Sequence, residues 1–248
     1  MKIKWNWVPN TLTLGNLTLG FVSMLVASEV LKSDPNCHES FALAGLLIII
    51  AAIFDGFDGM AARALNATSE IGADLDSLAD LTTFGIAPGF LAYKMFFEEI
   101  RILSDVFPLG MFLAALYPAC AAYRLARFNV AHDPNFFVGL PSPVAGVVVG
   151  FYPLVLHYNQ ISVWFALAFF SLTAFLMVSV VRYSKPQVAM RGKFNRKKGI
   201  FLAFAVLLIL VLLGVQRWPW FLYGIVFFYI FSGIVALVIQ TIQSLGEE

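Results

Sequence analysis

The chain has 248 residues, of which 60% are hydrophobic and 12% charged, and its formal net charge is +1. A soluble globular protein is roughly 45–50% apolar and about 25% charged, so this composition excludes an ordinary soluble enzyme, a disordered chain and a disulfide scaffold. The near-neutral charge gives no general field for nucleic acid, and we expect no nucleic-acid partner. The composition predicts an all-α, polytopic integral membrane helical bundle.

Apolar runs long enough to cross a bilayer, about 20 residues each, recur along the whole chain. They predict about eight transmembrane helices, at residues 10–31, 41–64, 73–97, 107–127, 141–159, 161–182, 199–217 and 219–242. If the N-terminus is inside, twelve of the sixteen lysines and arginines are cytoplasmic, as the positive-inside rule requires. Both termini are then expected in the cytoplasm, and the absence of a eukaryotic targeting signal favours a prokaryotic cytoplasmic membrane.

Five aspartates lie at or near the predicted cytoplasmic ends of the second and third helices. An ionised aspartate at a helix centre costs roughly 2.5–3.5 kcal/mol to insert, so such residues face a cavity, a partner or a metal. On a helix Asp55 and Asp58 are about 60° apart, and Asp76 and Asp80 about 40° apart, so each pair shares a face. Asp74 points roughly 160° away from Asp76 and is excluded from this group.

Four converging carboxylates repel one another unless cations lie between them. Oxygen ligands with no histidine or cysteine nearby suit Mg²⁺ or Mn²⁺ better than Zn²⁺, and two such ions about 3.5–4 Å apart form a phosphoryl-transfer clamp. We therefore expect two divalent cations, Mg²⁺ or Mn²⁺, as cofactors. Gly59, Ala62 and Gly72 lie among the acids and let a ligand approach the backbone closely, and Arg63 offers a fixed cation to a phosphate.

These residues together form one spaced pattern: Asp55-x2-Asp58-Gly59-x2-Ala62-Arg63-x8-Gly72-x3-Asp76-x3-Asp80. The pattern resembles the signature of the CDP-alcohol phosphotransferases at all eight fixed positions. Other segments resemble the phosphatidylserine synthase branch of that family. They are Pro9-Asn10-x-Leu12-Thr13 with Asn16, Leu78-Ala79-Asp80 with Phe84-Gly85-x-Ala87-Pro88, Arg124 to Asn129, Gly139-Leu140-Pro141-x-Pro143, and Leu176 to Ser179 with Arg182-Tyr183.

The resemblance covers about residues 9–186 and implies a two-part organisation. Residues 1–186 are expected to form the family core of about six transmembrane helices. Residues 187–248 are expected to add a basic loop and two C-terminal transmembrane helices. Family members are commonly dimers, so the resemblance also implies a homodimer.

The resemblance assigns roles to the acids and their neighbours. Asp55, Asp58 and Asp76 hold two divalent ions on the pyrophosphate of CDP-diacylglycerol. Asp80 is a further metal ligand and the general base for the hydroxyl of L-serine, and CMP leaves. The nucleotide-lipid pocket is expected to be formed by Gly59, Ala62, Arg63, Gly72, Asn10 and Thr13.

A serine subsite is expected at the end of the fourth predicted helix. Arg124 and Arg127 are three residues apart and so share a face. An arginine fork fits the carboxylate that serine carries, so we assign serine binding to Arg127 with Arg124, Phe128 and Asn129.

Two other interpretations remain open. A different family member would use another acceptor, as phosphatidylglycerophosphate, phosphatidylinositol-phosphate or phosphatidylcholine synthases do. A cation or proton transporter would also carry acids within the membrane. Clustering of the acids at one membrane face favours the enzyme over a transport pathway. The expected partners are CDP-diacylglycerol, L-serine and membrane lipids.

Overall fold

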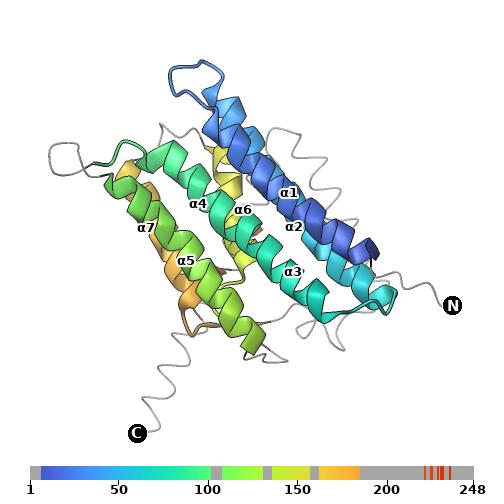
Figure 1. The fold of residues 1–248 in the computed structure, drawn as a ribbon. Coiled ribbons are helices and arrows are strands. Elements are labelled where there is room, and N and C mark those ends of the chain that lie inside the picture. The colour runs from blue at the N-terminus through green and yellow to red at the C-terminus, as the bar shows by residue number, and fades with distance from the viewer. Residues whose placement is uncertain are drawn as a thin grey trace, which may run out of the picture.

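A computed structural model of the chain describes residues 7–101, 108–130, 136–156 and 162–184, together with a few positions between 221 and 235. The described chain is a bundle of helices (Figure 1). The predicted helix at 199–217 and nearly all of the predicted helix at 219–242 lie outside the described residues, as does most of the 187–248 segment.

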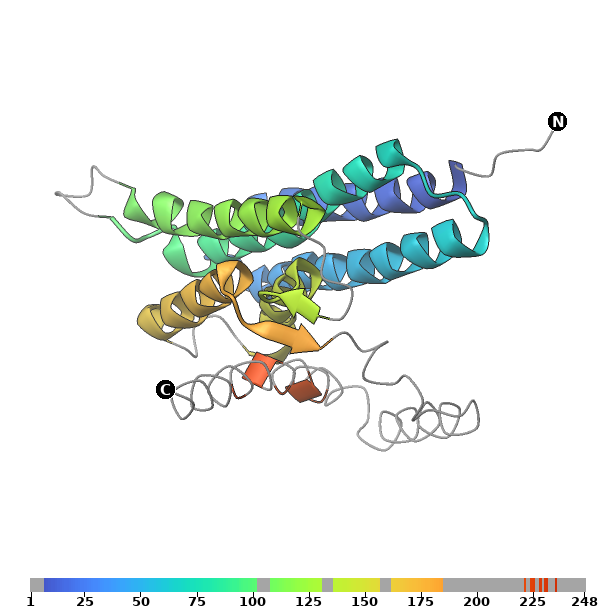
Figure 2. The ribbon, with the colours of Figure 1, turned by 90° about the horizontal axis from the view of Figure 1, so that it is seen from below.

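Helices α1 (Trp7–Ser28) and α2 (Cys37–Ala64) pack side by side along most of their length (Figures 1 and 2). The face that α1 buries carries small and polar residues, including Thr13, Gly20 and Ser23. Small side chains let helix backbones approach closely, and hydroxyl groups can bond across the contact. The Ser23 hydroxyl donates to the Ala44 carbonyl at 2.8 Å, which fixes the two helices in register.

The third predicted span is divided into four consecutive segments. They are α3 (Glu70–Asp80), the π-helix η1 (Leu81–Ile86), α4 (Ala87–Ala92) and a second π-helix η2 (Tyr93–Phe97). Helix α3 begins three residues before the predicted start, because Ser69 caps it by accepting a hydrogen bond from the Gly72 amide at 3.1 Å. π-Helical segments are rare in proteins, and those that occur are often found at functional sites. η1 begins directly after Asp80.

Three further helices complete the described bundle: α5 (Leu109–Val130), α6 (Ser142–Val155) and α7 (Val163–Val178). The prediction that the last of these continues to residue 182 is wrong. Arg127, reaching from α5, donates to the carbonyls of Met177, Val178 and Ser179, which lie at the end of α7. These bonds satisfy carbonyl groups that a helix end leaves without a partner, so the chain can turn away there.

A short strand pair qualifies the all-α prediction. β1 (Phe136–Val138) pairs antiparallel with β2 (Arg182–Ser184), with Phe137 opposite Tyr183. Gly139 follows β1 with a φ of +80°, a conformation that favours glycine, and its amide donates to the Val181 carbonyl at 2.8 Å. Three-residue strands are too short to show the alternating pattern from which strands are predicted.

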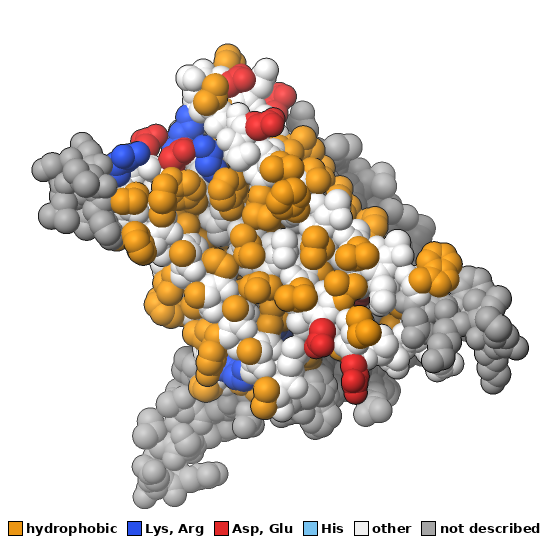
Figure 3. Space-filling view, viewed as in Figure 1, with side chains coloured by type: hydrophobic (Ala, Val, Ile, Leu, Met, Phe, Trp, Pro, Cys, Tyr) orange, Lys and Arg blue, Asp and Glu red, His pale blue; other side chains and the backbone are white. Residues whose placement is uncertain are grey.

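The described helices fit a membrane bundle. α1, α2 and α5 are each long and apolar enough to cross a bilayer, while α6 and α7 are apolar but shorter. Large apolar side chains such as Phe21, Phe112 and Phe175 are exposed along their flanks. Figure 3 shows such side chains over the middle of the molecule, with charged side chains gathered toward its two ends.

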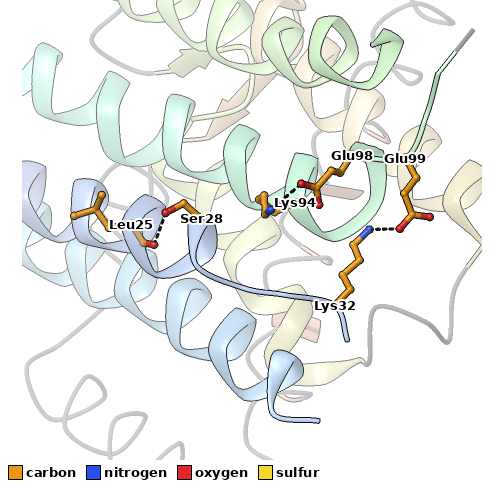
Figure 4. Close-up of polar contacts among 6 residues, drawn as sticks. All are labelled: Leu25, Ser28, Lys32, Lys94, Glu98 and Glu99. Carbon is orange, nitrogen blue, oxygen red and sulfur yellow. Dashed lines mark hydrogen bonds and ion pairs between the residues drawn. The ribbon is translucent and has the colours of Figure 1, made fainter. Parts of the chain in front are cut away.

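The two ends of the bundle differ in the arrangement of their charged side chains. At one end Lys32 lies 3.1 Å from Glu99, and Lys94 lies 2.7 Å from Glu98 (Figure 4). We call this the paired end. The opposite end, formed by the start of α1, the end of α2 and the start of α3, carries the signature aspartates, and we call it the acidic end.

Candidate metal and nucleotide site

A pocket of about 220 Å³ opens between α1, α2 and the first turns of α3. Its lining includes all six residues that the sequence assigned to a nucleotide-lipid pocket. These are Asn10, Thr13, Gly59, Ala62, Arg63 and Gly72. Asp58 and Asp76 line the same pocket, so two of the signature acids face the space that these six residues enclose.

The pocket is suited to an anion. Ser69, Gly72 and Ala73, from the N-terminus of α3, are part of its lining. The first amide groups of a helix have no partner within the helix and carry partial positive charge, which attracts phosphate groups. Arg63 adds a full positive charge from the end of α2.

Gly72 allows this arrangement because its position has almost no spare room. A Cβ atom there would lie 3.0 Å from Ser69 Oγ and 3.3 Å from Asn10 Oδ1. Glycine therefore lets the first turn of α3 approach α1. A Cβ at Gly59 would meet only the Arg63 side chain, at 3.5 Å, among its neighbours within 4 Å in the described chain. A side chain at position 59 would therefore take space in the pocket.

Three carboxylates converge beside the pocket. Asp55 from α2 and Asp76 and Asp80 from α3 each offer an oxygen, and these oxygens lie within 4.8 Å of one another. The Asp80 carboxyl group is 8% exposed and interacts directly with that of Asp55. One oxygen each of Asp76 and Asp80 is buried without a hydrogen-bond partner among the described residues. A donor set made only of carboxylate oxygens, some still free to coordinate, fits a hard divalent cation.

Asp58 has a different environment from these three. Its Oδ2 accepts a hydrogen bond from the Thr13 hydroxyl at 2.8 Å, and its side chain is buried in the pocket wall. Asp58 does not belong to the group of three converging carboxylates, although its sequence spacing places it beside Asp55. Asp74 is exposed and lines a separate hollow with Ser77 and Asn129.

The four residues assigned to serine binding are not gathered at one point. Arg124 is 5% exposed, donates to the Ser142 hydroxyl at 2.6 Å, and acts electrostatically on both Asp55 and Asp80. Its guanidinium also lies over the Phe128 ring, 5.5 Å from the ring centre. Arg124 is therefore placed toward the acidic cluster, and Phe128 lies against Arg124.

Arg127 and Asn129 make other contacts. The Arg127 guanidinium donates to four backbone carbonyls, those of Val178 at 2.9 Å, Val138 at 2.7 Å, Met177 at 3.2 Å and Ser179 at 3.0 Å. Asn129 is exposed and donates to the Ser77 hydroxyl at 3.0 Å. Arg127 thus joins β1 to the end of α7, and Asn129 joins α5 to α3.

Sequence reasoning did not single out Ser142, Ser69 or Thr83. Ser142 lies inside the Gly139–Pro143 run, and Ser69 precedes Gly72 at a capping distance, so both carried a local signal. Thr83 donates to the Asn16 carbonyl at 3.0 Å. That contact depends on how α1 and η1 pack, and no local sequence pattern predicts it.

The fold and site define a helical bundle of membrane type with an acidic cluster that could hold a metal ion beside a pocket suited to an anion. The model of the family "CDP-alcohol phosphatidyltransferase" matches residues 6–172. The chain belongs to this family.

Several curated relatives are named CDP-diacylglycerol–serine O-phosphatidyltransferase. The chain is 33% identical to one from Helicobacter pylori over 88% of this chain and 89% of that relative. It is 35% identical to one from Bacillus subtilis over 72% of this chain and 90% of that relative. It is 33% identical to one from Methanocaldococcus jannaschii over 77% of this chain and 83% of that relative.

Proposed function

We propose that the protein is a phosphatidylserine synthase, which transfers the phosphatidyl group from CDP-diacylglycerol to L-serine and releases CMP. Family membership and the shared name of relatives from bacteria and an archaeon support this activity. The observation that carries it in the structure is the convergence of Asp55, Asp76 and Asp80 beside a pocket that Arg63 and the α3 N-terminus make attractive to phosphates.

Asp55, Asp58, Asp76 and Asp80 are proposed to hold two divalent cations, Mg²⁺ or Mn²⁺, with the pyrophosphate. Bound there, the cations would neutralise charge that develops on the departing CMP. Asp58 keeps one oxygen on Thr13 and reaches the same pocket, so it links the nucleotide wall to the acidic cluster. The six residues of that wall are proposed to surround the cytidine and its phosphates, with Arg63 on a phosphate.

Asp80 is proposed to be the general base. A serine hydroxyl is a weak nucleophile at neutral pH and needs a base within about 2.6–3.2 Å. Asp80 takes the hydroxyl proton as the serine oxygen forms its bond to the phosphorus that carries the diacylglycerol. The bond from that phosphorus to the CMP oxygen breaks in the same in-line step, without a covalent enzyme intermediate.

For the serine carboxylate, the contacts favour Arg124 within the predicted cluster. Arg124 lies near the acids, and Ser142 and Phe128 hold its guanidinium. The Arg127 guanidinium donates hydrogen bonds to four backbone carbonyls. Arg127 is therefore proposed to support the subsite by fixing β1 to the end of α7. The acceptor site is proposed to face the cytoplasm of a prokaryotic membrane, and the homodimer remains a prediction.

An acceptor panel tests the proposal. Purified protein, Mg²⁺ and radiolabelled CDP-diacylglycerol are incubated with L-serine, glycerol 3-phosphate, inositol phosphate or choline. Labelled phosphatidylserine should form, and the other acceptors should give little product. Preferential reaction with another acceptor would transfer the protein to a different branch of the family. Cation flux through reconstituted vesicles without CMP release would instead support a transporter.

A further inference from the structure

Asn16 is a buried amide whose chemistry the proposed function does not use. Its side chain is 0% exposed, and neither its Oδ1 nor its Nδ2 has a hydrogen-bond partner among the described residues. Burying an amide in an apolar setting without such partners destabilises a fold. Unsatisfied groups of this kind in a native structure commonly reflect a bound water, an ion or a catalytic role.

Asn16 lies at the depth of the acidic cluster. Thr13, Asp58 and Asp76 form a layer in the pocket wall. One helical turn deeper along α1, α2 and α3, the corresponding residues are Asn16, Asp55 and Asp80.

Two contacts fix this register. A Cβ at Gly15 would lie 2.9 Å from the ring of Phe54, which places this part of α1 level with the neighbour of Asp55. Thr83, one turn beyond Asp80, donates to the Asn16 carbonyl at 3.0 Å. The Asn16 backbone is therefore held between α2 and the π-helix that follows Asp80.

The hydrogen-bonding needs of this deeper layer are complementary. Asp80 Oδ1 is a buried acceptor without a partner among the described residues, and Asn16 Nδ2 is a buried donor in the same condition. Asn16 Oδ1 can also accept from a water bound to a cation. Ser23 lies two turns further along the same buried face, and its hydroxyl donates to the Ala44 carbonyl. A lack of hydrogen-bond partners within the described chain is therefore a feature of the Asn16 amide and is not shared by Ser23.

We propose that Asn16 is a positioning residue of the divalent-cation site, whose amide, unpaired in the described chain, hydrogen-bonds to the deeper carboxylates, Asp55 and Asp80, when the ions are bound and so fixes their orientation. This inference rests on the proposed metal-dependent function. Residues that hydrogen-bond to metal ligands typically change metal affinity by about 10- to 100-fold when they are replaced. Simple packing between α1 and α2 would not require an amide at this position.

The test measures Mn²⁺ binding to the full chain in detergent by electron paramagnetic resonance, with thermal unfolding of the metal-free protein in parallel. The variants are Asn16→Leu, which keeps the branched shape, and Asn16→Ala, which avoids crowding. Ser23→Ala is the matched control, a buried polar residue on the same face. Both Asn16 variants should weaken Mn²⁺ binding by about 10- to 100-fold. Ser23→Ala should bind Mn²⁺ like the wild type, and metal-free Asn16→Leu should unfold no earlier than the wild type.

A purely structural role gives a different pattern. Unchanged Mn²⁺ affinity in both Asn16 variants, or a loss no larger than that of Ser23→Ala, overturns the inference and leaves the proposed function intact. If the wild-type protein itself binds no Mn²⁺, both the inference and the metal-dependent function fail.

Discussion

The two ends of the bundle show two ways of placing acids at a membrane boundary. At the paired end, Glu98 and Glu99 each have a lysine within 3.1 Å. At the acidic end, four signature aspartates lie near two arginines, Arg63 and Arg124, and three of their carboxylates converge on one another. Each of these two glutamates is therefore matched by one lysine, whereas at the acidic end three carboxylates bring negative charge together. The proposed divalent ions would neutralise this charge.

The largest effect should follow from removing the base at the acidic end. Asp80→Asn should lower turnover by about 10²- to 10⁴-fold, because an amide cannot accept the serine proton. Binding of CDP-diacylglycerol should be largely preserved. Rates of CMP release and equilibrium binding of the nucleotide-lipid measure the two effects. Glu98→Gln at the paired end is the matched control, and near-normal turnover in Asp80→Asn would show that another group is the base.

Asp58→Asn should weaken metal and nucleotide binding together. Asp58 faces the pocket and is tied to Thr13, so loss of its charge affects both ligands. The Mg²⁺ concentration for half-maximal CMP release should rise by more than about tenfold, by analogy with changes around metal ligands. Asp74→Asn, at an exposed acid outside this pocket, should leave that concentration unchanged. A rise of equal size in both variants would refute a local role for Asp58.

Substitution of the two arginines of α5 should have different effects on the serine KM and on stability. Arg124→Lys should raise the serine KM about tenfold with little change in the CDP-diacylglycerol KM, because lysine loses the fork that holds a carboxylate. Arg127→Lys should mainly lower thermal stability, by about 1–3 kcal/mol, because carbonyl acceptors lose their donors. A serine-specific KM effect that is larger in Arg127→Lys would return the carboxylate contact to Arg127.

The smallest effect belongs to the paired end. Lys32→Gln should change the free energy of unfolding by less than about 1 kcal/mol, because its partner Glu99 is 80% exposed and an ion pair at the surface contributes little. CMP release should be unchanged. A large loss of activity, measured beside thermal unfolding, would mean that the two ends are coupled and that the comparison is too simple.

Of the four acids that helical spacing predicted to converge, three do so. Asp76 and Asp80 converge with Asp55, because residues four apart share a helix face, but Asp58 bonds to Thr13 and lies outside this group. The six pocket residues, which the family resemblance implied, line one pocket. Spacing could not tell Arg124 from Arg127. Both lie on the same face of α5, but long side chains reach different partners, and which partner is near depends on how α6 and α7 pack.

The departures from the predicted fold have similar causes. The π-helices η1 and η2 keep the apolar composition of an ordinary span, so hydropathy does not reveal them. The end of α7 depends on Arg127, which lies about 50 residues earlier in the chain. Asn16 looked like one polar residue in an apolar helix, and only the packing shows that its amide is fully buried and that its carbonyl accepts from Thr83 of η1. The end of α7 and the environment of Asn16 depend on contacts distant in sequence.

The central claim is that cations held by these aspartates are required for transfer to serine. The most direct measurement is CMP release by purified protein from CDP-diacylglycerol and L-serine, before and after removal of divalent ions with a chelator. The account predicts that release requires serine, stops in the chelator, and returns when Mg²⁺ or Mn²⁺ is added in excess. Serine-dependent release that continues undiminished without divalent ions would contradict it.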